Sequence, residues 1–125
     1  MRDLNTFKIS LNFYLYEFEC RHCQAVMVEY RLIDMLQALR QKLGSAIVIT
    51  SGYRCPSYNR AVGGAENSFH TKGMAADFYV PGTELTIVEL ADLCESWGFG
   101  GVGAYVEQGF VHVDSRRVSH PVRFR

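Results

Sequence analysis

Three residues, His70, Asp77 and His112, have the side-chain types expected of ligands to a catalytic zinc ion. His70 and Asp77 lie seven positions apart, and His112 lies in the short apolar run Phe110–Asp114. A catalytic zinc takes three nitrogen or oxygen ligands from the protein and keeps one position for water. These residues therefore predict one zinc ion and metal-assisted hydrolysis.

The neighbours of these residues strengthen the prediction. Val111 and Val113 flank His112, and strand alternation points His112 to the face opposite the two valines. Asp114 shares the face of His112 and can support it, as carboxylates do for zinc-bound histidines. Gly73 allows a tight backbone turn between His70 and Asp77. Each residue alone also fits a structural role, such as a core histidine or a capping aspartate, so the prediction rests on the set.

The hydrophobic pattern predicts the elements that position these residues. A helical apolar stripe ends at Gly44, a suitable C-cap, and contains Val28, Leu32, Met35, Leu36, Leu39 and Leu43. Residues 46–50 and 75–80 are predicted strands, and residues 100–105 and 110–114 are a predicted hairpin. A short helix is expected to begin at Pro56 and to end before Gly63.

A second long helix is expected to begin at a Thr83 cap and to end at Gly98. Its predicted core positions are Leu85, Val88, Leu90, Leu93 and Trp97. Helices that bracket a few strands joined by hairpins indicate an α+β fold with a mainly antiparallel sheet flanked by helices. We expect one small domain over residues 1–125, with its core at about 15–116.

Composition excludes several classes of function. The 125 residues carry no net formal charge, which argues against nucleic acid as the main partner. No apolar run approaches the roughly 18 residues that span a bilayer, so no membrane insertion is expected. Met1–Ser10 lacks a charged segment followed by an apolar one, so no signal peptide is visible and synthesis in the cytoplasm is expected. We assume a monomer.

The cysteines are Cys20, Cys23, Cys55 and Cys94. Cys20 and Cys23 form a lone C-x-x-C without a second such pair, so reduced thiols are the favoured interpretation. A minor metal site or a disulfide at Cys20 and Cys23 is the alternative. His22, between the two, is expected to be poorly placed as a ligand, and Cys94 is expected in the core.

Several motifs together resemble the zinc D-Ala-D-Ala carboxypeptidase family, most closely its branch of small bacterial and phage cell-wall peptidases. The motifs are Ser51-Gly52-Tyr53-Arg54, Asn59-Arg60-Ala61-Val62-Gly63-Gly64, Ser68-x-His70-x-x-Gly73-x-Ala75-x-Asp77, Gly101-Val102-Gly103 and Phe110-Val111-His112-Val113-Asp114. The resemblance spans about residues 15–116, nearly the whole chain.

The resemblance implies a hedgehog-like or D-Ala-D-Ala-peptidase-like fold in which His70, Asp77 and His112 hold zinc. It implies that Arg54 faces the substrate and stabilises charge on the scissile carbonyl or on a carboxylate, as an arginine can. Ser68 and Tyr53 are then expected to help bind the substrate. A surface ion pair is the structural alternative for Arg54.

One departure concerns the general base. Several family members carry a carboxylate three residues before the last histidine, and this chain has Gly109 there. We expect the catalytic base to be Asp114, then Glu107, and as a third choice no protein base at all. Branches with a similar Gly-Phe-Val-His sequence resemble peptidoglycan endopeptidases.

The sequence therefore predicts a zinc peptidase that cleaves peptidoglycan stem peptides or cross-links, as a D,D-carboxypeptidase or an endopeptidase. D-Ala-containing substrates are implied by the resemblance alone. The alternative is a non-catalytic zinc-containing module that binds cell wall or a partner protein, and the missing acid before His112 favours it. Since the substrate lies outside the cytoplasm, a phage or prophage product released to the wall is one expectation.

Overall fold

The computed structural model describes residues 5–124. Residues 1–4, which belong to the segment searched for an export signal, and residue 125 lie outside the described part. In chain order the elements are β1 (Lys8–Ser10), β2 (Phe13–Tyr14), η2 (Leu15–Phe18), α1 (Tyr30–Leu43), β3 (Val48–Ser51), α2 (Pro56–Ala61), η3 (Phe69–Lys72), β4 (Ala75–Tyr79), α3 (Ile87–Trp97), β5 (Gly101–Tyr105), β6 (Phe110–Asp114) and β7 (Val122–Phe124).

The helix α1 forms where the apolar stripe predicts it. Leu32, Leu36 and Leu39 are completely buried, and Met35 packs against the same core from a partly buried position. The helix ends at Gly44, which adopts a left-handed conformation with φ of 66° and donates its amide to the Arg40 carbonyl. The predicted helix is thus confirmed, except that α1 begins at Tyr30, so Val28 precedes it.

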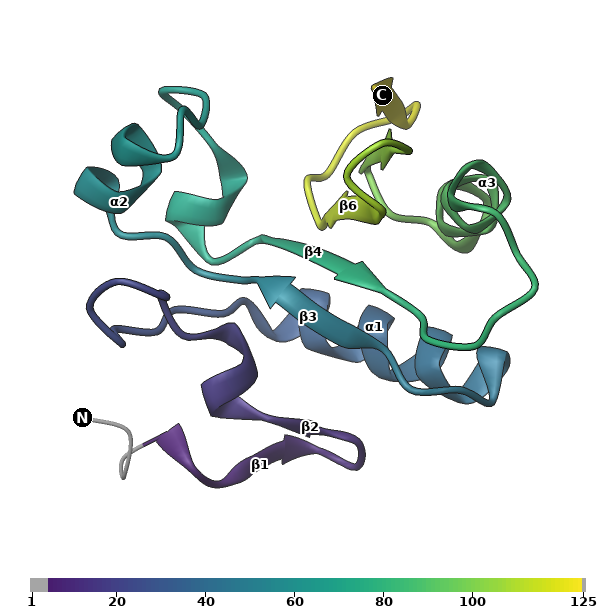
Figure 1. Ribbon diagram of the computed structural model, residues 1–125, viewed down its shortest axis with the longest axis horizontal. Helices are drawn as coiled ribbons and strands as arrows, with labels where there is room; N and C mark the ends of the chain where they lie inside the picture. The colour runs from purple at the N-terminus through teal and green to yellow at the C-terminus, as the bar shows by residue number, and fades with distance from the viewer. Residues whose placement is uncertain (1–4, 125) are drawn as a thin grey trace.

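Five strands form the main sheet in the order β3-β4-β6-β5-β7. Every neighbouring pair is antiparallel except β5 and β7, which run parallel. In Figure 1, α1 lies along one side of β3 and β4, and α3 lies beside β5 and β6. The predicted α+β class with a mainly antiparallel sheet is therefore confirmed.

Strand alternation separates the core from the site. In β4, Ala76 and Phe78 are buried in the hydrophobic core, as Val111 and Val113 are in β6. The residues between them turn to the opposite face, and the register pairs Asp77 with His112 directly. Packing of the valines and of Phe78 thus fixes which residues meet on the other face.

The start of α3 differs from the prediction. The N-cap is Thr86, not Thr83, and its side chain accepts the Glu89 amide while the Glu89 carboxylate accepts the Thr86 amide. This reciprocal capping box sets the helix start, so Leu85 precedes the helix and is exposed. Val88 is also exposed, and both were wrongly predicted as core. Leu90 is buried, and Leu93 and Trp97 pack against the core.

Other boundaries shift or were missed. The first predicted strand begins at Val48 rather than at residue 46, whereas the hairpin of β5 and β6 forms as expected. Strand β7 was not predicted, because its three residues are too few for a clear strand pattern and it pairs with β5 only after the chain crosses back to it. Within residues 5–124, no helix is both long enough and apolar enough to cross a membrane.

Candidate metal centre and its cavity

His70, Asp77 and His112 come together as the sequence predicts. They lie on η3, β4 and β6, and all three are buried. One ligand atom from each falls within 4.8 Å of the others, which is the spacing of a group that can hold a metal ion. Two imidazoles and a carboxylate are donors that suit zinc, so the donor set fits the predicted ion.

A short helical turn aims the His70 ring at Asp77. The Ser68 hydroxyl accepts the His70 amide at the start of η3, and Gly73 ends the turn with φ of 70°. The Nδ1 atom of His70 donates to the Gly52 carbonyl at 2.7 Å, which leaves Nε2 3.2 Å from Oδ1 of Asp77. A carbonyl that fixes the tautomer in this way is a common partner of metal-binding histidines.

The His112 ring is held from its other side. Its Nδ1 atom lies 2.9 Å from Oδ1 of Asp77, and its Nε2 atom lies 2.9 Å from Oδ2 of Asp114. Asp114 is completely buried and also accepts two hydrogen bonds from the Arg116 guanidinium, at 2.7 and 2.8 Å. This arrangement presents Nδ1 of His112 as the ligand atom.

The small residues of β5 make room for this support. Gly101 is paired with Asp114 across the hairpin, and a Cβ atom on Gly101 would overlap the Asp114 carboxylate. The glycine is therefore a steric requirement of the buried pair of Asp114 and His112.

Protonation in the metal-free site follows these contacts. Burial alone would raise the pKa of Asp77, but hydrogen bonds from His112 and His70 hold that pKa well below its ordinary value. Burial would likewise raise the pKa of Asp114, but hydrogen bonds from Arg116 and His112 lower that pKa to about 2. Burial alone would lower the pKa of His112, but the hydrogen bonds to Asp114 and Asp77 outweigh burial and raise that pKa.

Arg54 reaches the site from the turn after β3. Its Nη2 atom lies 3.3 Å from Oδ2 of Asp77, and its Nη1 atom donates to the Asn59 side chain at 3.2 Å. Its Nε atom donates to the Ser51 hydroxyl at 3.2 Å. The Arg54 side chain is 16% exposed, so the pair with Asp77 is not the surface ion pair considered from the sequence.

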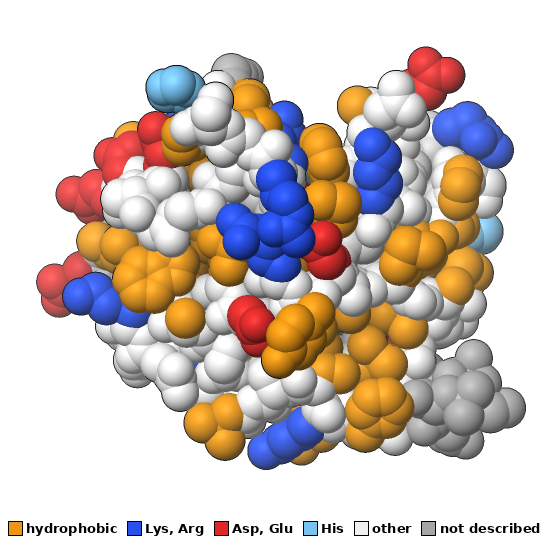
Figure 2. All heavy atoms as spheres, turned by 180° about the vertical axis from the view of Figure 1, so that it is seen from behind, with side chains coloured by type: hydrophobic (Ala, Val, Ile, Leu, Met, Phe, Trp, Pro, Cys, Tyr) orange, Lys and Arg blue, Asp and Glu red, His pale blue; other side chains and the backbone are white. Residues whose placement is uncertain are grey.

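A cavity of about 500 Å³ opens over the ligands. One wall is the segment from Val62 to His70, which follows α2, and the other consists of Tyr105, Phe110 and Phe124 from the C-terminal strands. In Figure 2, the upper outline of the molecule is hollowed between two projecting parts of the surface. The side chains of Arg54 and Arg116 reach the same cavity, so it combines two cations with an aromatic wall.

The other predicted site residues fall in different places. Ser68 lines the cavity, whereas Tyr53, Glu107 and Asp114 are not among the lining residues. Glu107 is exposed on the turn between β5 and β6, and Asp114 lies behind the His112 ring. Of the described carboxylates, Asp77 is the only one that lines the cavity.

Sequence reasoning missed several lining residues. Arg116 stacks on Phe69 with its guanidinium carbon 4.4 Å from the ring centroid, and strand alternation beyond Asp114 could have placed it on the site face. Tyr105 and Phe110 stack with ring centroids 4.7 Å apart, and they are opposite neighbours in the predicted hairpin. No sequence signal pointed to Phe124 as a lining residue, because strand β7, which carries it, was not predicted.

Comparisons with known proteins agree with this geometry. The peptidase M15 family matches residues 12–114. The chain is 38% identical over 96 residues to the peptidoglycan L,D-endopeptidase MepK of Escherichia coli strain K12, covering 71% of this chain and 52% of that protein. It is 39% identical over 74 residues to the probable peptidoglycan L,D-endopeptidase MepK of Haemophilus influenzae, covering 55% of this chain and 39% of that protein. The chain thus spans about half the length of the Escherichia coli relative and a smaller share of the Haemophilus influenzae relative.

Proposed function

Because the chain belongs to the peptidase M15 family, we propose that it is a zinc-dependent peptidoglycan endopeptidase that acts on an L,D-peptide bond. The observation that carries the proposal is the buried convergence of His70, Asp77 and His112 at the base of an open cavity. The printed names of the MepK relatives favour an endopeptidase over the D,D-carboxypeptidase also considered from the sequence.

The proposed metal is zinc, held by Nε2 of His70, a carboxylate oxygen of Asp77 and Nδ1 of His112. When bound, zinc activates a water molecule and polarises the scissile carbonyl group. Gly52 and Asp114 keep the two imidazoles in the orientation that ligation requires.

The cations on the cavity have separate proposed roles. Arg54 is adjacent to Asp77 and is placed to stabilise negative charge on the substrate carbonyl. Arg116 stacks on Phe69 at the cavity and is placed to bind a substrate carboxylate. Ser68 lines the cavity beside His70, where its hydroxyl can also contact the peptide.

A second candidate function is a non-catalytic zinc module that binds cell-wall peptides. The observation in its favour is that no described carboxylate other than Asp77 lines the cavity, so no side chain of the usual kind stands ready as a general base. The same cavity, arginines and aromatic wall would serve binding alone.

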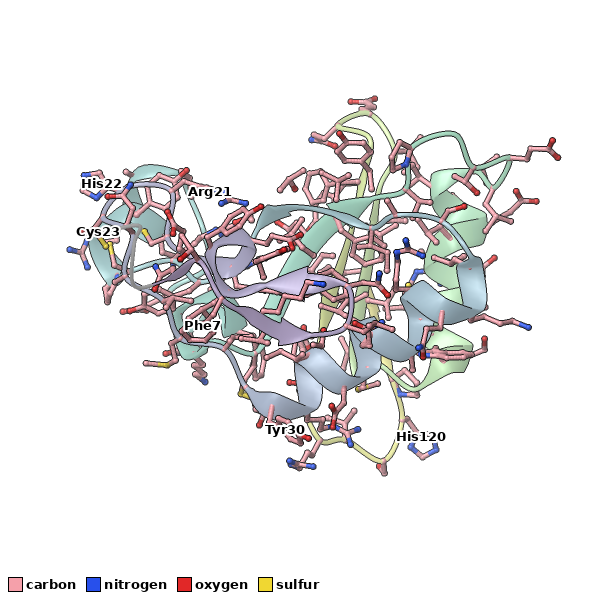
Figure 3. All side chains as sticks on the ribbon, turned by 90° about the horizontal axis from the view of Figure 1, so that it is seen from below. Phe7, Arg21, His22, Cys23, Tyr30 and His120 are labelled. Carbon is pink, nitrogen blue, oxygen red and sulfur yellow. The ribbon has the colours of Figure 1, made fainter. Side chains whose placement is uncertain are left out.

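Digestion of defined muropeptides distinguishes the two. Wild type, His112→Ala and the matched control His120→Ala are tested on substrates that carry an L,D-cross-link, a D,D-cross-link or a free D-Ala-D-Ala end. His120 is exposed and does not line the cavity, and in Figure 3 it projects from the edge of the molecule. Products are identified by mass spectrometry, and bound zinc is measured by elemental analysis.

We expect wild type and His120→Ala to bind zinc at the ligand set and to cleave the L,D-linked substrate, and His112→Ala to lose both properties. Release of free D-Ala instead would identify a carboxypeptidase. Zinc bound at His70, Asp77 and His112 without cleavage of any substrate would favour the binding module.

A further inference from the structure

A second group of metal-ligating side chains lies outside the cavity. The sulfur atoms of Cys20, Cys23 and Cys55 all lie within 4.8 Å of one another. The first two follow η2, and Cys55 precedes α2, so segments far apart in the sequence supply the group. The sequence shows only the C-x-x-C, and the fold adds the third thiol. None of the three lines the cavity.

The spacing of the sulfur atoms suits a shared metal ion. In a tetrahedral site with Zn–S bonds of about 2.3 Å, two sulfur atoms are about 3.8 Å apart. The sulfur atoms of Cys20 and Cys55 are 3.8 Å apart. A disulfide would require about 2.0 Å between sulfur atoms and would leave the third cysteine unpaired.

Backbone hydrogen bonds help to hold the thiols together. The Cys20 amide donates to the Ala25 carbonyl at 2.7 Å, and the Gln24 amide donates back to the Cys20 carbonyl at 2.9 Å. Gln24 has φ of 62°, a left-handed conformation that is uncommon outside glycine, and the Asn5 side chain donates to its carbonyl at 3.0 Å. The turn that carries Cys20 and Cys23 is thus fixed in a costly conformation.

Further bonds tie this turn to the segment that carries Cys55. The Tyr53 amide donates to the Phe18 carbonyl at 2.8 Å. The Arg21 guanidinium donates to the Ile49 and Thr50 carbonyls at 3.0 and 3.3 Å. The two halves of the cysteine group therefore face one another in the folded protein, as the ligands of a preformed site must.

His22 lies beside this group but is not one of its three members, in agreement with its expected poor placement as a ligand. Its ring stacks on Tyr58 with ring centroids 5.9 Å apart. In Figure 3, His22 and Cys23 project at the same end of the molecule, beside the sulfur atoms gathered there.

We propose that Cys20, Cys23 and Cys55 bind a second zinc ion whose role is structural. Three thiolates select a soft or borderline metal, and none of the three lines the cavity where a substrate would bind. Cys55 directly follows Arg54, so the ion anchors the turn that carries Arg54 to the segment after η2. This site does not depend on the proposed peptidase activity.

Cobalt(II) gives a direct test, because cobalt bound by thiolates shows intense charge-transfer absorption in the near ultraviolet. The first site contains no sulfur, so this absorption reports only the cysteine site. The reduced, metal-free chain is titrated with cobalt(II) as wild type, Cys23→Ser, His112→Ala and the control Cys94→Ala. Cys23 is exposed and can be changed without disturbing the core, and Cys94 is a buried cysteine outside the group.

Wild type and Cys94→Ala are expected to bind about two metal ions per chain and to show the absorption. His112→Ala is expected to keep the absorption with about one ion, whereas Cys23→Ser loses most of it and retains the ion of the first site. Wild type without the absorption would overturn the proposal, as would a disulfide between any two of the three cysteines in protein purified with zinc.

Discussion

Asp114 holds His112 by a 2.9 Å hydrogen bond to Nε2, on the side of the ring opposite Asp77. The Asp114 carboxylate is completely buried, and its oxygen atoms also accept hydrogen bonds from the Arg116 guanidinium. Asp114 therefore acts through His112, and the catalytic base first expected at this residue becomes a positioning residue in the function that we propose.

Asp114→Asn tests this role. The amide keeps the shape of the side chain but weakens the support of the imidazole, so zinc affinity is expected to fall by about 10- to 100-fold. Competition with a chelator of known affinity measures the change, and Asp34→Asn, an exposed aspartate of α1, is the control. Activity is expected to recover substantially at saturating zinc.

The two predicted bases give different outcomes under the same assay. If Asp114 transferred the proton itself, Asp114→Asn would stay about 10²- to 10⁴-fold slow even when fully loaded with metal. If Glu107 were the base, Glu107→Gln would show that loss instead. We expect Glu107→Gln to retain its rate, because Glu107 is exposed and does not line the cavity.

Arg54→Ala is expected to lower kcat by about 10²- to 10³-fold, the usual cost of losing a donor to a developing oxyanion. Arg54→Lys is expected to recover little of this, because a lysine cannot contact Asp77, Asn59 and Ser51 at once. Arg60→Ala, an exposed arginine of α2, is the control. Steady-state kinetics on the cleaved muropeptide measures kcat and KM separately. A rise in KM alone would assign Arg54 to ground-state binding.

Gly101→Ala is expected to destabilise the protein by about 1–3 kcal/mol and to weaken zinc binding, because the added methyl group overlaps the Asp114 carboxylate. Chemical denaturation and zinc titration measure the two effects. Val106→Ala, on the exposed turn of the same hairpin, is the comparison. An undisturbed zinc affinity would mean that the pair of Asp114 and His112 tolerates the displacement.

The metal-free protein is expected to be most stable between about pH 4 and pH 6.5. The lowered pKa values of Asp77 and Asp114 stabilise the folded state above their ordinary value of 3.8, and this contribution is lost as the pH falls toward 2. The raised pKa of His112 stabilises the folded state below its ordinary 6.5, and this contribution is lost as the pH rises through the raised value.

Thermal unfolding in the presence of a chelator measures this profile. In His112→Gln the loss of stability on the alkaline side is expected to shrink, because the titrating imidazole is gone. Zinc requires the neutral imidazole, so the zinc-bound protein is expected to gain stability over the same alkaline range. A metal-free profile that rises steadily from pH 5 to pH 8 would contradict the raised pKa of His112.

Local sequence signals were sufficient to predict the candidate metal ligands and most of the helices and strands. His70, Asp77 and His112 converge as expected, and the resemblance to the zinc D-Ala-D-Ala carboxypeptidase family is confirmed by membership of the peptidase M15 family. Alternation around His112 and the helical stripe of α1 depend on near neighbours in the sequence, so both could be seen before the fold was known.

Features that depend on distant segments could not be predicted. Cys55 joins Cys20 across 35 residues, and a C-x-x-C examined alone gives no sign of it. Phe124 reaches the cavity only because β7 pairs with β5. Both are tertiary contacts that local propensity does not encode. The Thr86 cap is different, because its Thr-x-x-Glu pattern with Glu89 is local and was overlooked in favour of Thr83.

The contacts of Arg21 also bear on self-association. β3 is an outer strand of the main sheet, and unpaired carbonyls on such a strand can recruit a strand from a second molecule. Arg21 caps the carbonyls of Ile49 and Thr50, while β7 covers the outer side of β5. The turn that carries Cys20 and Cys23 therefore also shields the β3 edge of the sheet from pairing with a strand of a second molecule.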